Sequence, residues 1–176
     1  EASLVKELEN LGIGRPSTYA AIMGNIQKRG YVRRVKGALI PTFTAYAVVQ
    51  FLERYFSDMV NLQFTANLEN TLDAISRSEM KSDDFLSHFY FGQNGSPGLK
   101  ALLDSKFDKD QSRTIMELQD SDDNSISVKI GRYGVYLQGK DTNTTMPDES
   151  IPSEISFENA LKSLQKKMDS PIEICS

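Results

Sequence analysis

The chain has 176 residues, of which 39% are hydrophobic and 25% charged, and its formal net charge is −4. This is an ordinary globular composition, sufficient for one good core or two to three small modules. Cys175 is the only cysteine, which excludes an internal disulfide and a CxxC zinc site. No apolar run approaches the roughly 18 residues of a membrane span, so we expect a cytoplasmic protein without membrane partners.

The charge is spread unevenly along the chain. Residues 1–60 carry eight basic and five acidic residues, whereas residues 61–176 carry twelve basic and nineteen acidic residues. Between Glu9 and Glu53 there is no acidic residue at all. Because carboxylates repel phosphates, an acidic protein that keeps one segment free of them is expected to present that segment to a nucleic-acid backbone.

The first 60 residues have the element order of a winged helix-turn-helix. The apolar spacing predicts a helix over 2–11, ended by Gly12 and Gly14, and a second helix from Ser17 to about Arg29. Two short β-prone runs, 31–35 and 38–42, then flank a Lys-Gly turn, and a helix to about Phe56 follows. A winged helix-turn-helix has this order of helix, turn, helix, hairpin and helix.

The remainder is predicted to be helical first and mixed later. Helices are expected over 66–76, 82–91 and 98–105, with a loop at 92–98. Beyond Asp104 the apolar period becomes two, which predicts strands around 126–130 and 135–137, a polar loop over 140–150 and a last helix over 156–168. The fold class is therefore mostly α with small β elements (α+β), with a ββ(β)α module at the C-terminal end. We divide the chain into 1–60, 61–107 and 108–176.

One edge of the second helix carries the residues suited to bind phosphate. At 100° per residue, Thr18, Asn25 and Arg29 fall within roughly 40° of one another, about a quarter turn from the apolar stripe. Ser17 and Thr18 stand at the helix start, where free N–H groups and the dipole attract anions, and Arg15 is adjacent. The hairpin adds further cations, namely Arg33, Arg34 and Lys36.

Structural roles for the same residues stay open. Ser17 can serve only as an N-cap, and Arg29 only as a partner of the helix dipole. His88 is interpreted as a helix residue without a metal-ligand set. The acidic string from Asp120 resembles half of a calcium loop but lacks its glycine and distal glutamate, so we interpret it as a solvated turn. We assign no catalytic residue and no metal site.

The string EASLVKELENLGIGRPSTYAAIMGNIQKRGYV, followed by LIPT and FTANLENTLDAI, resembles a segment of the bacterial type IA DNA topoisomerases. The resemblance covers about residues 1–90. It implies an ATP-independent isomerase that relaxes negatively supercoiled DNA by transient single-strand cleavage. It further implies that this segment grips single-stranded DNA, with Arg15, Thr18 and Arg29 at positions of DNA contact. Ala45 stands where the family commonly has glycine.

The resemblance also implies what lies outside this chain. The family's nucleophilic tyrosine sits in a Met-Arg-Thr-type string, which does not occur here, so no tyrosine of this chain is assigned as catalytic. The family's acidic Mg²⁺-binding cluster belongs to an N-terminal domain that is likewise absent. We expect a fragment that is inactive alone, holds no cofactor, acts as a monomer with the rest of its polypeptide, and is associated with the nucleoid.

The C-terminal strings VKIGRYGVYLQG and IPSEISFENALKSL resemble the C-terminal repeat of some bacterial topoisomerases. Lys129, Arg132, Tyr133 and Lys140 are candidates for a stacking and charge platform for single-stranded DNA. Packing of a small sheet is the favoured role for Tyr136, and both roles stay open for Tyr133.

Two other functions are compatible with the sequence. A winged-helix transcription regulator would read duplex DNA through residues 17–29. An interaction domain would use the acidic residues 61–176 to bind a protein such as RNA polymerase.

Overall fold

The computed structural model describes residues 1–93, 95–121, 124–147 and 150–168. It separates the chain into two compact units. The first contains residues 1–28 and 51–107, and the second contains residues 29–50 and 108–176. Cys175, and two residues of the predicted acidic turn, Asp122 and Asp123, lie outside the described residues.

The first unit is built from helices. It contains α1 (Ala2–Asn10), α2 (Pro16–Lys28), the last turn of α3 (Phe43–Tyr55), α4 (Ser57–Val60), α5 (Leu62–Ser76), α6 (Ser82–Phe91) and α7 (Leu99–Leu103). Gly12 and Gly14 have φ of 70° and 75°. These positive angles let the chain reverse between α1 and α2 as the glycine pattern predicts.

Aromatic contacts join the helices of the first unit. Phe107 lies against Phe51, Tyr55 and Phe56, with ring centroids 4.9 to 5.9 Å apart. Phe64 of α5 and Phe85 of α6 both stack on Phe89. Full burial is rare here, and among the described residues of this unit the buried hydrophobic side chains are Tyr19, Met23 and Ala66.

The segment 92–98, which the sequence predicts to be a plain loop, instead contains a small ladder. Strands β3 (Gly92–Gln93) and β4 (Ser96–Pro97) pair antiparallel. Gly92 has φ of 85°, and a Cβ added at Gly92 or Gly98 would collide with the other's backbone segment. The two glycines allow this approach.

The second unit begins with the predicted hairpin. Strands β1 (Val32–Val35) and β2 (Ala38–Pro41) pair antiparallel, with Val35 opposite Ala38. Lys36 and Gly37 both have positive φ, 48° and 85°, as a two-residue turn of this kind requires. Thr42 caps the start of α3, since its Oγ1 accepts a hydrogen bond from the Ala45 N–H at 3.4 Å.

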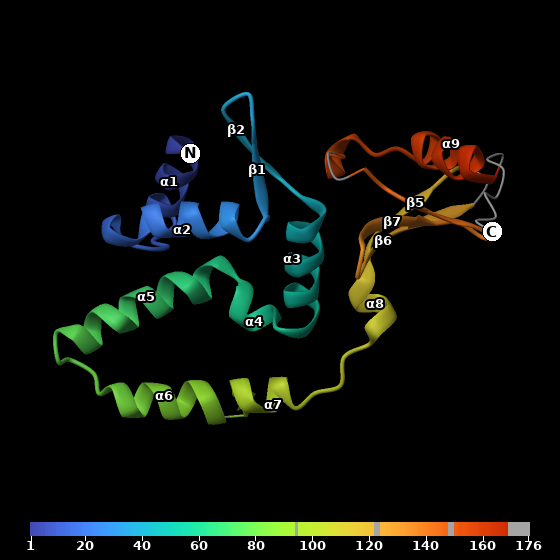
Figure 1. Cartoon of the computed structure of the whole chain (residues 1–176). Helices are drawn as coiled ribbons and strands as arrows, with labels where there is room; N and C mark the ends of the chain where they lie inside the picture. The colour runs from blue at the N-terminus through green and yellow to red at the C-terminus, as the bar shows by residue number, and fades with distance from the viewer. Residues whose placement is uncertain (94, 122–123, 148–149, 169–176) are drawn as a thin grey trace, which may run out of the picture. The chain divides into compact units, whose positions relative to one another are not determined.

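The larger part of the second unit is an antiparallel sheet covered by a helix. After α8 (Lys109–Arg113), strands β5 (Thr114–Gln119), β6 (Ser125–Gly131), β7 (Gly134–Gln138) and β8 (Asn143–Thr145) lie in the order β5-β6-β7-β8. A short 3-10 helix (Pro152–Glu154) precedes α9 (Phe157–Met168), which lies along the sheet (Figure 1). The core of this unit is formed by a set of buried apolar residues: Phe43, Ile115, Ile126, Val128, Leu137, Ala160 and Leu164.

The expected α+β class is confirmed, with corrections in detail. The helix predicted over 66–76 begins at Leu62. Strand β5 is absent from the expected elements, and β8 falls in the expected polar loop. Both strands pair along the edges of the hairpin β6-β7, so their strand state depends on partners that periodicity does not show. No helix within the described residues is long and apolar enough to cross a bilayer.

Candidate nucleic-acid interface

Helix α2 begins one residue earlier than its serine suggests. The Arg15 carbonyl accepts hydrogen bonds from the Thr18 and Tyr19 N–H groups at 2.8 and 3.2 Å. The Thr18 hydroxyl accepts from the Arg15 N–H at 2.9 Å and lies 3.0 Å from the Arg15 carbonyl. Arg15 is therefore the N-cap position, Pro16 opens the helix, and the expectation that Ser17 caps it is wrong.

The solvent edge of α2 carries the predicted polar residues. Ser17, Thr18 and Asn25 are exposed, whereas Tyr19 and Met23 on the opposite side are buried. Among the described residues no acceptor bonds the Ser17 N–H. This N–H is one of the unpaired donors of a helix start, and it stands beside an exposed hydroxyl. The edge therefore offers hydrogen-bond donors without a carboxylate on its own helix.

Arg15 does not face solvent freely. Its Nε and Nη2 lie 3.3 and 2.8 Å from Asp73 Oδ2, and its Nη2 lies 3.4 Å from Asn70 Oδ1. Its Nη1 donates to the carbonyls of Gly12 and Gly14, at 3.3 and 2.7 Å. The hydrogen bond to the Asp73 carboxylate, and then its charge, raise the pKa of the Arg15 guanidinium above its ordinary value. The segment between Glu9 and Glu53, which has no acidic residue of its own, therefore contacts a carboxylate of α5.

The remaining predicted cations belong to the second unit. Arg29 is exposed and follows the last residue of α2, and Arg33 and Arg34 lie on β1. Arg34 is exposed and Arg33 is half-buried, because consecutive strand residues point to opposite faces of the hairpin. Arg15, Ser17, Thr18 and Asn25 therefore share the first unit, while Arg29, Arg33 and Arg34 share the second. Their joint action as a DNA-binding set stays a prediction.

Tyr133 lies at the tight turn between β6 and β7. Its side chain is 89% exposed, and Arg132 Cζ lies 5.8 Å from its ring centroid. Beside it is a hollow of about 430 Å³ lined by three cations (Arg113, Arg132 and Lys167), two tyrosines and polar side chains of β8. None of the described residues that line this hollow is acidic. Tyr136, for which packing was favoured, lines the same hollow and is half-buried.

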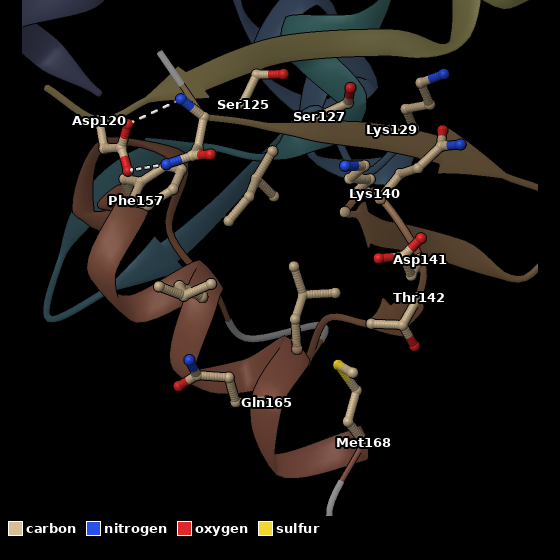
Figure 2. A pocket seen from close by; sticks show the side chains of 16 residues that line it. Asp120, Ser125, Ser127, Lys129, Lys140, Asp141, Thr142, Phe157, Gln165 and Met168 are labelled. Atoms are coloured by element: carbon tan, nitrogen blue, oxygen red, sulfur yellow. Dashed lines mark hydrogen bonds between the residues drawn. The ribbon is translucent and has the colours of Figure 1, made fainter. Parts of the chain in front are cut away.

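The other two platform candidates lie elsewhere in the second unit. Lys129 and Lys140 line a hollow of about 740 Å³ between the sheet and α9 (Figure 2). Asp120 and Asp141 line it too, and Phe157 and Met168 contribute its apolar side. Two lysines and two aspartates balance in formal charge, so this hollow lacks the positive character of the one at Tyr133. The predicted platform is thus divided between two sites.

Comparison with known proteins places these features in a family. A family model described as DNA topoisomerase matches residues 1–87, and one described as topoisomerase C-terminal repeat matches residues 119–171. The chain belongs to the bacterial type I DNA topoisomerases. It is 40% identical to DNA topoisomerase 1 of Synechococcus elongatus over 99% of this chain and 20% of that protein. It is 37% identical to DNA topoisomerase 1 of Mycolicibacterium smegmatis over 92% of this chain and 18% of that protein.

A solved structure agrees with the assignment to the topoisomerases. Full-length topoisomerase I of Thermotoga maritima matches 85% of this chain and 25% of its own chain, with 31% identity and a TM-score of 0.64. The chain spans about a fifth of the length of the curated relatives it matches. The alternative of a transcription regulator is not favoured by these matches.

Sequence reasoning missed several residues of the candidate interface. Glu69, Asn70 and Asp73 lie in the string LENTLD, and the separation of four residues between the two acids places them on one helix face. The sequence shows this spacing, but it does not indicate that Arg15 would contact Asp73. Arg113 and Lys167 were missed because each comes from an element at a different end of the C-terminal module.

Proposed function

We propose that the chain is the single-stranded-DNA-binding portion of a type IA DNA topoisomerase. That enzyme would relax negatively supercoiled DNA by transient single-strand cleavage through a tyrosine outside this chain. The observation that carries the proposal is the exposed edge of α2, with Ser17, Thr18 and Asn25 on it, inside the segment that the topoisomerase model matches. Hydroxyl, amide and backbone N–H donors of this kind bind phosphate oxygens without reading sequence.

The cations of the second unit extend the proposal to a second contact. Positive charge for the phosphate backbone of a DNA strand is supplied by Arg29, Arg33 and Arg34. The hollow at Tyr133 combines cations with an exposed ring on which a base can stack. Stacking on aromatic rings and salt-dependent backbone contacts are the means by which proteins hold single strands without sequence preference. We therefore include Arg132 and Tyr133, together with Arg113 and Lys167, in the DNA-binding set.

A metal is assigned to the whole enzyme and not to this chain. No group of three or more His, Cys, Asp or Glu residues that could hold a metal ion occurs in the described part of the chain. We place the Mg²⁺ of the full-length enzyme in a domain beyond this chain. A monomeric state and a cytoplasmic, nucleoid-associated location belong to the same proposal.

Competition between single-stranded and duplex DNA tests the proposed function. The purified chain is mixed with a labelled oligo(dT), and unlabelled single-stranded or random duplex competitor is added at several salt concentrations. We expect the single strand to compete better, with affinity that falls as salt rises, because phosphate contacts release counterions. A strong preference for one duplex sequence would contradict the proposal and support a regulator.

A further inference from the structure

Two carboxylates of α5 hold the turn that leads into α2. Besides the bonds of Asp73 to the Arg15 guanidinium, Glu69 Oε1 accepts a hydrogen bond from the Gly14 N–H at 3.1 Å. Both acids are more than fifty residues away in the sequence from the residues that they bond. Since the acids are four residues apart, they project from one face of α5. The turn is thus fixed by an element remote in sequence.

The guanidinium of Arg15 is fully occupied by these contacts. An arginine has five N–H donors, one on Nε and two on each Nη. The contacts described above give one acceptor for each donor: Asp73 twice, Asn70 once, and the carbonyls of Gly12 and Gly14. Two of the five bonds are therefore made to the turn itself, whose glycines have positive φ. The side chain links α5 to the backbone that sets where α2 begins.

We propose that Glu69 and Asp73 are positioning residues for DNA binding, which act through Arg15 and the turn at residues 12–15 to place the start of α2. The inference rests on the proposed function, because it concerns the same edge of α2. Neither carboxylate is required to touch DNA. A carboxylate near a phosphate site lowers affinity by repulsion, so the gain from an ordered helix start has to exceed that loss.

The opposite role, in which Asp73 competes with DNA phosphate for Arg15, accounts for fewer of the contacts. It explains the ion pair of 2.8 Å between Arg15 and Asp73. It does not explain why Glu69 bonds the Gly14 amide, or why the guanidinium also bonds two carbonyls of its own turn. The two roles predict opposite signs when the carboxylate is removed.

The test is the affinity of the 176-residue chain for oligo(dT) in three variants. Asp73→Ala removes the acceptor, Asp73→Asn keeps an acceptor oxygen without the charge, and Glu7→Gln removes an exposed charge on α1 as a matched control. We expect Asp73→Ala to weaken binding by about threefold to tenfold although a negative charge is lost. Asp73→Asn should recover part of the affinity, and the salt slope should stay unchanged because no phosphate contact is removed.

A second readout does not depend on DNA. Hydrogen exchange of the Gly14 amide should be faster in Asp73→Ala and in Glu69→Ala, which removes the acceptor of its N–H, than in the wild type, while far-UV circular dichroism stays the same. Tighter DNA binding by Asp73→Ala than by Glu7→Gln, or unchanged Gly14 exchange in both α5 variants, would overturn the inference. If the wild type fails to bind oligo(dT), the proposed function falls, and the exchange rates still decide whether the carboxylates order the turn.

Discussion

Arg15 and Arg29 show that two arginines of one charge-rich segment differ in what they are available to bind. The guanidinium of Arg15 is held by α5, and its side chain is 31% exposed. Arg29 is exposed beyond the end of α2, and no side-chain hydrogen bond from it occurs among the described residues. A cation whose donors are unused can take a phosphate without losing an existing bond. Arg29 is therefore the residue where the DNA-binding proposal is tested most directly.

Replacing Arg29 with alanine should remove one phosphate contact. We expect weaker binding of oligo(dT) and a salt slope that is smaller by about 0.7, the value for one contact to a single strand. The measurement is fluorescence anisotropy over a salt series. Lys6→Ala on α1 removes an exposed cation outside the candidate edge and should leave the slope unchanged. An Arg29→Ala variant with wild-type affinity and slope would count against the assignment.

Replacing Tyr133 with alanine tests the aromatic contact. A base stacked on an aromatic ring contributes about 1–3 kcal/mol to single-strand binding, so the variant should lose affinity in that range. Tyr133→Phe keeps the ring and should bind like the wild type. Because the side chain is 89% exposed, thermal stability should not change in either variant. Equal affinity of all three proteins would count against the stacking of a base on this ring.

At the scale of elements, α9 shows how one helix can serve both the core and the surface. Ala160 and Leu164 are buried against the sheet, with 3% and 4% of their surface exposed, whereas Leu161 is 38% exposed. Leu164 also lies close to Gly139, where an added Cβ would be 3.0 Å from its Cδ1. The apolar stripe therefore fixes the helix on the sheet, and Lys167 on the same helix lines the hollow at Tyr133.

Truncation of Leu164 should destabilise the second unit. Leu164→Ala removes buried methyl groups and leaves a cavity, which typically costs about 2–5 kcal/mol. Leu161→Ala is the matched control and should cost about 1 kcal/mol or less, because its side chain is already partly in water. Thermal unfolding followed by circular dichroism measures both. Similar losses for the two variants would mean that α9 does not pack through the Leu164 face.

At the scale of the whole molecule, the chain is a part whose two units carry separate halves of the proposed DNA-binding set. Several large apolar side chains of the first unit are exposed, among them Leu62 at 57%, Leu86 at 56% and Phe91 at 66%. Large apolar side chains are typical of interfaces where they lie together on the surface. Since the chain spans about a fifth of its relatives, the rest of the same polypeptide is the partner we propose for this surface.

The isolated chain should bind DNA without changing its topology. Incubated with negatively supercoiled plasmid and Mg²⁺, it should leave the distribution of topoisomers unchanged on an agarose gel. The reason is chemical, since no nucleophile is assigned to this chain by its sequence. Relaxation of the plasmid by the purified chain would overturn the proposal that cleavage belongs to a tyrosine elsewhere.

The helix stripes and the hairpin turn were predictable because they depend on neighbours in the chain. Tyr19 and Met23 fall on the buried side of α2 as their spacing indicates, and Lys36-Gly37 forms the predicted turn. Val49 lies in the apolar run of α3 and is nevertheless 50% exposed. Its helix spans two units, so a single apolar stripe does not describe which of its faces is covered.

The sequence by itself determined the helical periods, the turn chemistry and the cationic segment without acids, since all three are local properties of the chain. It also determined the resemblance to topoisomerases, because a family motif consists of residues in a fixed order along the chain. Only the tertiary structure decided the electrostatics at the start of α2. Because α5 packs against the turn, Asp73 accepts hydrogen bonds from Arg15, and Glu69 accepts one from the Gly14 amide. Charge acts through space, so a segment free of acids in sequence is not free of them in the fold.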